Sequence, residues 1–158
     1  MGQREAYSSP LVDASYLGHT NIVKVLLIYG ANVNFKNAHG WNALIHISLA
    51  GRTETLITSG EKVNARNNIG ETALVIASEK EHAETVKLMI AHGADVNKGN
   101  RENWTPLIAA CYYGHTDIVH LLIQSGASVN KRDNINSMTL NVASKKRFCD
   151  IVTRGQCG

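Results

Sequence analysis

The sequence has no long hydrophobic run and few aromatic residues or prolines. Of its 158 residues, 6% are aromatic and two are proline. The longest apolar candidate, around residues 22–29, is interrupted by Lys24 and falls short of the ~20 residues of a membrane-spanning helix. The first residues, MGQREAYSSP, lack the apolar core of a secretory signal. We therefore expect a chain without a membrane span.

Cysteine is also scarce, since the chain has three cysteines and none of them forms a C-x-x-C pair. A disulfide framework and a structural zinc site are both unexpected with this odd, scattered set. Cys111 replaces the serine that the other units carry at the same place, so we expect a small buried residue. A reducing compartment fits best, which predicts a cytoplasmic or nuclear location.

Common catalytic and nucleotide-binding motifs are missing from the sequence. It contains no G-x-S-x-G, no P-loop and no G-x-G-x-x-G. His115 and His120 are not spaced as the H-E-x-x-H pair that binds zinc on one helical face, and no carboxylate cluster accompanies the other histidines. We expect no catalytic residue, no metal site and no cofactor, and we do not predict an enzyme.

What the sequence does contain is a repeat. Positions that correspond to Pro106 are Pro10, Ala43, Ala73 and Thr139, at successive steps of 33, 30, 33 and 33 residues. Leucine follows each of these positions, and a glycine and then a Val-Asn pair close each of the first four units. Self-similarity at this period is typical of a solenoid, in which each unit packs only against its neighbours.

Residues 104–130 show the repeating unit most clearly. Apolar residues recur at helical spacing on both sides of Gly114-His115, which predicts two short amphipathic helices closed by Gly126. In the first unit, Ser9 is suited to cap a helix and Pro10 to occupy its first turn, where a missing N–H costs nothing.

These motifs resemble the ankyrin repeat family. The resemblance rests on Thr105-Pro106-Leu107, on the Gly-His pairs and on the stretch 93–97 (GADVN), and it covers nearly the whole chain. It implies an all-α ankyrin-repeat solenoid of stacked helix-turn-helix units with hairpin-like loops. We expect a single domain, 1–158, with four repeats and an incomplete C-terminal fifth, at approximately 4–36, 37–66, 67–99, 100–132 and 133–158.

Two units depart from the pattern. From Gly51 to Gly60 there are nine steps, against twelve from Gly18 to Gly30, so the second helix of repeat 2 lacks almost one turn. We expect a packing deficit and the least stable joint of the array there. In repeat 3, Glu81 replaces the glycine that ends the first helix, so either the helix continues or the residue accepts a strain of ~1 kcal/mol.

Asparagine recurs in the segments between units. Asn37, Asn67 and Asn100 are suited to hold tight turns through their side chains. The asparagines after valine have two interpretations: they bond the backbone of the next repeat, or, as the family resemblance implies, they are substrates of an asparaginyl hydroxylase. Asn97 fits the second interpretation best.

The resemblance implies a concave binding surface made of loop tips and the exposed side of the first helices. Tyrosine and tryptophan on such a surface offer large contact area with few rotors. We predict a monomeric protein–protein interaction module, although the two tryptophans have an alternative role in packing across the loop base. The predicted partner-binding residues are Tyr16, Leu17, His39, Trp41, Leu49, Trp104, Tyr112, Tyr113, Lys145 and Lys146.

Two other functions stay open at this point. From Lys131 onward six basic residues accompany two acidic ones, within a chain of net charge +3, so bases and aromatics could together bind single-stranded nucleic acid or a nucleotide. Alternatively, the chain is a structural spacer or cap that self-associates through its unfinished fifth repeat.

Overall fold

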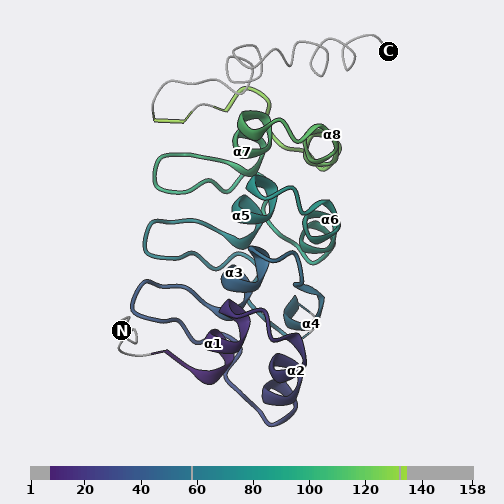
Figure 1. Cartoon of the computed structure of the whole chain (residues 1–158). Coiled ribbons are helices and arrows are strands. Elements are labelled where there is room, and N and C mark those ends of the chain that lie inside the picture. Colours follow the sequence, from purple (N-terminus) through teal and green to yellow (C-terminus); the bar gives the residue numbers. More distant parts are fainter. Residues whose placement is uncertain (1–7, 58, 132, 135–158) are drawn as a thin grey trace.

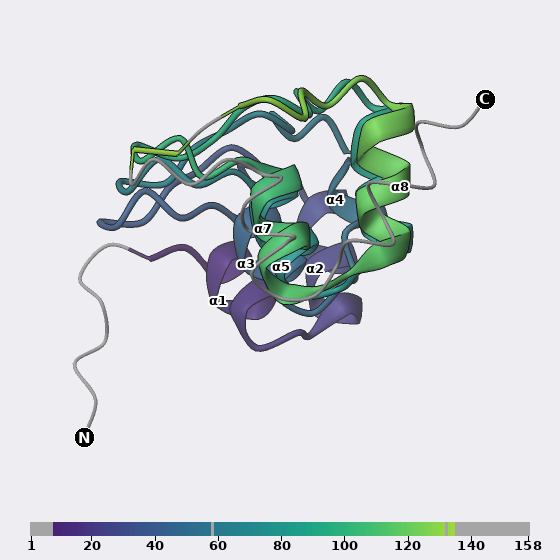
Figure 2. The ribbon, with the colours of Figure 1, turned by 90° about the horizontal axis from the view of Figure 1, so that it is seen from above.

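The computed structural model describes residues 8–57, 59–131 and 133–134, and the helices in these ranges alternate between two parallel columns (Figure 1). The first helices of the units are α1 (Pro10–Tyr16), α3 (Ala43–Ser48), α5 (Ala73–Glu79) and α7 (Pro106–Tyr113). The second helices are α2 (Thr20–Ile28), α4 (Glu54–Ile57), α6 (Ala83–Ala91) and α8 (Thr116–Gln124). The loops project from the side of the first helices (Figure 2). The predicted all-α stack of helix pairs is confirmed.

Each first helix begins at a side-chain cap. Ser9 Oγ accepts a hydrogen bond from the Val12 N–H at 3.3 Å, as predicted, and Asn42 Oδ1 accepts one from the Ile45 N–H at 2.9 Å. Thr72 and Thr105 cap α5 and α7 in the same way. Each cap satisfies an N–H that has no partner inside the helix and contributes ~1 kcal/mol.

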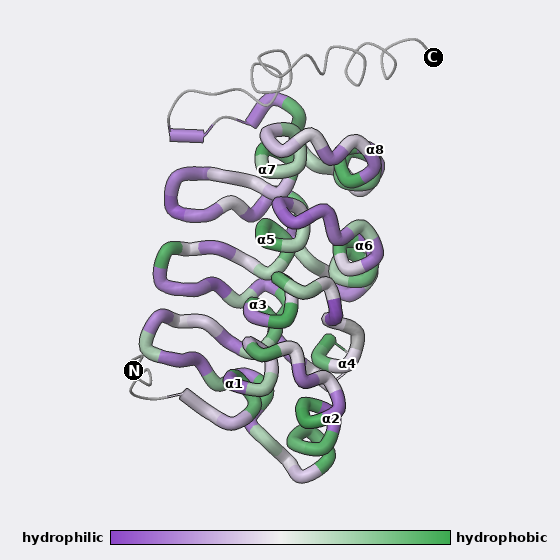
Figure 3. The backbone as a smooth tube through the Cα atoms, in the orientation of Figure 1, coloured by the Kyte–Doolittle hydropathy of each residue, from purple (hydrophilic) through white to green (hydrophobic). Residues whose placement is uncertain are grey.

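The hydrophobic core lies between the two columns and continues from one helix pair to the next. The leucine two residues after each cap is 1% exposed in all four described units, at Leu11, Leu44, Leu74 and Leu107. Figure 3 shows the hydrophobic residues along the helices and mostly hydrophilic residues along the loops. The constant positions of the repeat therefore form one continuous core.

The helix-ending residue of each unit takes a left-handed conformation. Gly18 and Gly114 have φ values of 72° and 85°, and Glu81 has a φ of 64° at the same place. Of the two alternatives for Glu81, the structure shows the strained turn. Its carboxylate lies 3.6 Å from His115 Nδ1, an ion pair when the imidazole is protonated.

Helix α4 has four residues, whereas α2, α6 and α8 have nine each. Leu56 and Ile57 are nonetheless buried. Ile47, which is fully buried, stands where the other units have alanine. That this joint is the least stable one stays a prediction.

Asparagine side chains connect neighbouring units. Asn64 Nδ2 donates to the Gly93 carbonyl at 2.9 Å, and its Oδ1 accepts from the Asp95 N–H at 2.8 Å. Asn97 makes the same pair of bonds to residues 126 and 128. The predicted inter-repeat bonding is confirmed for these two residues, while hydroxylation of Asn97 stays a prediction.

A second set of asparagines shapes the loops. Asn37 Oδ1 accepts hydrogen bonds from the His39 and Trp41 N–H groups, each at 3.0 Å. Asn67 and Asn100 make equivalent bonds within their own loops. The predicted turn-holding role is therefore confirmed.

The predicted fifth unit, 133–158, lies almost entirely outside the described residues, and so do Lys145 and Lys146. The repeat boundaries stay a prediction. Among the residues with described positions, no helix has the length and apolarity that crossing a membrane would require.

Candidate functional site

Exposed apolar residues gather where the first helices end. Tyr16 and Leu17 are 67% and 61% exposed, Leu49 is 38% exposed, and Tyr112 and Tyr113 are 43% and 45% exposed. These residues lie at or just after the C-terminal ends of α1, α3 and α7. Side chains this exposed contribute less to the stability of the stack than the buried leucines do. We call this surface, together with the loop residues that contact it, the inner face.

The N-terminal part of the inner face holds an aromatic cluster of Tyr16, Trp41 and His46. The ring centroids of Tyr16 and His46 are 5.4 Å apart with the rings at 74°, and those of Trp41 and His46 are 4.8 Å apart. Trp41 is half-buried and also packs against the core. It therefore supports the base of the loop, which is the alternative role considered for it.

The C-terminal part holds a second cluster of Trp104, Tyr112, Tyr113 and His115. Trp104 and Tyr112 meet edge to face with centroids 5.4 Å apart, and Tyr112 and Tyr113 do so at 5.0 Å. Tyr113 stacks on His115, with centroids 6.1 Å apart and ring planes at 12°. Edge-to-face and stacked pairs are favoured arrangements that order the rings. A loop residue and the end of α7 thus form one aromatic surface.

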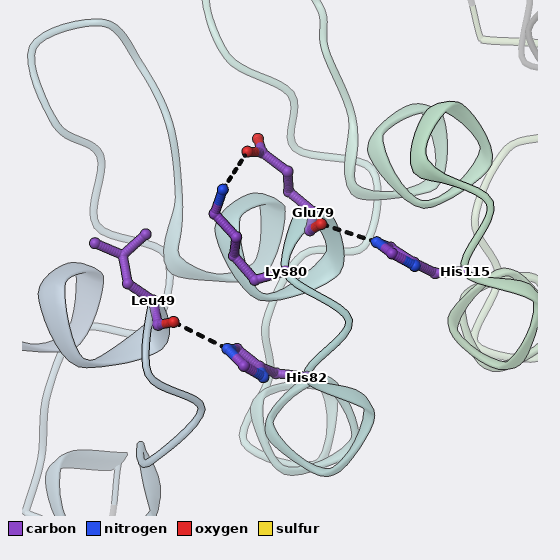
Figure 4. Close-up of polar contacts among 5 residues, drawn as sticks. All are labelled: Leu49, Glu79, Lys80, His82 and His115. Carbon is purple, nitrogen blue, oxygen red and sulfur yellow. Dashed lines mark hydrogen bonds and ion pairs between the residues drawn. The ribbon is translucent and has the colours of Figure 1, made fainter.

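Glu79 and Lys80 lie between the two clusters in chain order. Their side chains form an ion pair with a distance of 3.0 Å (Figure 4). This hydrogen bond raises the pKa of the Lys80 ammonium. The pKa of Tyr113 is also raised, first by partial burial of its hydroxyl and then by the Glu79 charge. Tyr113 therefore presents a neutral phenol at physiological pH.

Histidines from the following unit fix the backbone at the inner face. His82 Nε2–H donates to the Leu49 carbonyl and His115 Nε2–H to the Glu79 carbonyl, each at 2.9 Å (Figure 4). The two histidines occupy the same position in successive units, so this position has a structural role in the stack. The bonds hold the ends of α3 and α5 in place, so the side chains there project from a fixed frame.

The structure brings most of the predicted binding residues onto the inner face. Tyr16, Trp41, Trp104, Tyr112 and Tyr113 make ring contacts there. Leu17 and Leu49 are exposed beside the helix ends, and His39 is exposed on its loop. Whether these residues bind a partner stays a prediction.

The sequence interpretation missed His46, which joins Tyr16 to Trp41. The lack of an accompanying carboxylate cluster argues against a metal ligand at this histidine but does not predict the ring contact. The signal was its place in the repeat, because the residues at the corresponding positions are Asp13, Ile76 and Ala109. An imidazole here is unusual, because Ile76 and Ala109 are buried in the core at the same place.

The interpretation also missed Glu61, which stands where three other units have alanine. Its side chain is buried, and its Oε1 accepts a hydrogen bond from Asn42 Nδ2 at 2.6 Å. Its Oε2 has no hydrogen-bond partner. Burial raises the pKa of Glu61 from 4.5 to about 8, because the ionised form loses its hydration.

The described residues offer little for catalysis. They include no group of three or more histidine, cysteine or acidic residues that could hold a metal ion. Cys111 is buried as predicted, and burial raises the pKa of its thiol to about 11. It is therefore a neutral thiol rather than a nucleophile.

Comparison with known proteins identifies the repeat. A family model described as "Ankyrin repeats (3 copies)" matches residues 51–133, and one described as "Ankyrin repeat" matches residues 7–38. Ankyrin repeat and KH domain-containing protein mask-1 of Caenorhabditis elegans is 33% identical over 88 residues, which are 52% of this chain and 3% of that protein. An ankyrin repeat and KH domain-containing protein of Caenorhabditis briggsae matches with the same identity and coverage.

The chain thus spans only a small part of the length of these relatives, whose names describe ankyrin repeat proteins and no catalytic activity. The first of the two family models alone covers more than half of the chain. Together with the stacked helix pairs, this match shows that the chain belongs to the ankyrin repeat family.

Proposed function

We propose that the chain binds a partner protein on its inner face, with the two aromatic clusters as anchors. Ankyrin repeats are generally protein–protein interaction modules, and the chain belongs to this family. The observation that carries this proposal is the cluster of Trp104, Tyr112 and Tyr113. Their rings order one another through edge-to-face contacts, while both tyrosines are more than 40% exposed. Ordered aromatic residues lose little entropy on binding and so make effective hot spots.

Charge on the inner face favours a protein over a nucleic acid. Lys80 is already paired with Glu79, and Lys131 donates to the Asn97 carbonyl at 2.6 Å. Nucleic-acid binding draws most of its affinity from cations that neutralise phosphates. In the described part of the chain, the aromatic clusters are not accompanied by a row of free cations. A salt titration distinguishes the two, because aromatic contacts weaken little with ionic strength.

Site-specific photo-crosslinking tests the proposal. A photoreactive amino acid at Tyr113 should form covalent adducts with proteins of a cell lysate, because this position lies on the inner face. The same amino acid at His120, which is exposed on α8 in the other column, is the matched control and should form few adducts. Equal crosslinking from both positions, with both chains folded, would exclude the inner face as the specific binding surface.

A further inference from the structure

The short helix α4 leaves a groove in the column of second helices. Figure 1 shows α4 between the longer α2 and α6. A hollow of about 590 Å³ lies against α2 and the end of α4, and a second one of about 460 Å³ lies between α2, α4 and α6. Lys24 and Thr55 line both hollows, so the two adjoin. Volumes of this size are typical of ligand sites.

One wall of the groove is apolar. Lys24, Leu27 and Ile28 are spaced at i, i+3 and i+4, so they form one stripe of α2 that faces the groove. Ala31 and Val33 continue this wall. Ile28 is 80% exposed, although burying such a side chain would stabilise the molecule by about 2 kcal/mol.

The exposed isoleucine is particular to this unit. The residues at the place of Ile28 are Ala91 in α6 and Gln124 in α8. The repeat frame therefore does not require a large aliphatic side chain there. The missing turn of α4 and the exposed Ile28 of α2 occur side by side, so the groove has a large aliphatic side chain on its wall.

The other end of the groove is positively charged. Lys24 forms no hydrogen bond or ion pair with any residue that the structure describes, and Arg52 donates only to the neutral Gly18 carbonyl at 3.4 Å. Glu84 also lines this end, but its carboxylate is bonded to Lys87 Nζ at 2.6 Å. Two cations therefore lack a carboxylate partner among the residues with described side chains.

A buried hydroxyl adds a further unmet polar group. Thr53 lines the same hollow and is 1% exposed, and its Oγ1 has no hydrogen-bond partner. A buried hydroxyl without a partner costs about 1–3 kcal/mol. The two exposed cations are the groups at this end that a polar ligand atom can reach directly.

We propose that this groove, the α4 notch (Lys24, Leu27, Ile28, Arg52, Thr53 and Thr55), binds an acidic amphipathic helix of a partner protein. The groove occupies the place of an absent helical turn, so a helix lying there would restore the packing of the column. Its apolar side would cover Leu27 and Ile28, and its carboxylates would meet Lys24 and Arg52. The α4 notch lies on the second-helix column, away from the loops (Figure 2), so the proposal is independent of the inner face.

Fluorescence anisotropy with a defined probe tests the proposal. The probe is a fluorescein-labelled helical peptide of leucine and glutamate, patterned so that the leucines share one face, and its control has lysine in place of glutamate. We expect the acidic peptide to bind at least about tenfold more tightly than the basic one. Lys24→Glu with Ile28→Glu should weaken binding at least about tenfold, while Lys62→Glu with Ile69→Glu, matched changes at exposed loop residues, should not.

Closing the notch provides the second measurement. Replacing residues 54–59 by a copy of residues 84–92 gives α4 the length of α6, and this variant should fold and lose the acidic peptide. Equal binding of both peptides, or retention of the acidic peptide by the lengthened variant, would overturn the proposal. Displacement of the acidic peptide by inorganic phosphate would also overturn the proposal, because it would indicate a simple anion site. A self-association of the chain that Lys24→Glu abolishes would overturn it too, because it would indicate that a second copy of the chain occupies the groove.

Discussion

The Glu61 carboxyl group is bonded to Asn42 through one oxygen and has no partner for the other. With a pKa raised from 4.5 to about 8, the folded protein binds this proton more tightly than the unfolded chain does. The stability that the neutral carboxyl contributes is complete below pH 4.5 and is lost as the pH rises through about 8. The protein should therefore become less stable with rising pH over this interval.

Replacing Asn42 and Glu61 by the corresponding residues of the third unit tests the effect of Glu61 on the pH dependence of stability. The variant Asn42→Thr with Glu61→Ala carries the pair found at Thr72 and Ala94. Because one pKa unit corresponds to about 1.4 kcal/mol and the pKa of Glu61 is raised from 4.5 to about 8, we expect the free energy of unfolding above pH 8 to rise by up to about 5 kcal/mol. Urea unfolding at several pH values between 4.5 and 8 measures the change.

The control for this prediction is Glu102→Ala, which removes an exposed carboxyl. Its unfolding free energy should keep the pH dependence of the parent. An identical pH dependence in the parent and in the Asn42→Thr/Glu61→Ala variant would refute the role given to Glu61.

Asn64 provides a second test at the scale of one residue. Its side chain makes two hydrogen bonds to the backbone of the next unit, so Asn64→Ala should destabilise the stack by about 1–2 kcal/mol. Asn21→Ala removes an exposed asparagine of α2 and should change stability by less than about 0.5 kcal/mol. Urea unfolding would disprove the bridging role if the two variants lost equal stability.

At the scale of elements, α4 is the shortest helix of its column. It has four residues and buries Leu56 and Ile57, whereas α6 and α8 each have nine residues and bury three. Short helices with little packing open most easily. We expect the amides of residues 54–57 to exchange with solvent faster than those of α6 and α8 in a hydrogen-exchange experiment. Slower exchange in α4 than in α6 would contradict the predicted weak joint.

The stability of the lengthened α4 variant tests the same prediction of a weak joint. The copied segment adds apolar side chains that can pack against α2 and α6. We expect its free energy of unfolding to exceed that of the parent by about 2–4 kcal/mol, as burial of one or two aliphatic side chains would give. Calorimetry measures this as a higher melting temperature, and an unchanged or lower one would show that α4 is already as well packed as its neighbours.

The helices themselves were predictable because their signals are local or periodic. Ser9 and Thr105 cap helices through bonds to residues three positions on, and the buried leucines recur with the repeat. The missing turn of α4 was visible as a shorter distance between glycines. The groove beside it was not predicted, because exposure of Ile28 depends on how two helices of different length pack, which a linear pattern does not contain.

At the scale of the whole molecule, constant and variable positions have separate roles. The leucines, caps and asparagine bridges form a frame that continues from unit to unit. The residues that differ between units, such as Tyr112 and Tyr113, lie exposed on the inner face. The sequence predicted a shared surface for Tyr16, Tyr112 and Tyr113, which are exposed at helix ends, but not that His46 joins Tyr16 to Trp41, since that contact joins two units.

The most direct test of the central claim is affinity capture with three versions of the chain. The parent, Tyr112→Ala with Tyr113→Ala, and the control His120→Ala with Ile123→Ala, which alters exposed residues of α8, would each be incubated with cell lysate and the retained proteins quantified by mass spectrometry. We expect at least one protein to be retained by the parent and the control and lost with the aromatic variant, whose circular dichroism should match the parent. If all three folded chains retain the same proteins in equal amounts, the inner face is not the binding surface.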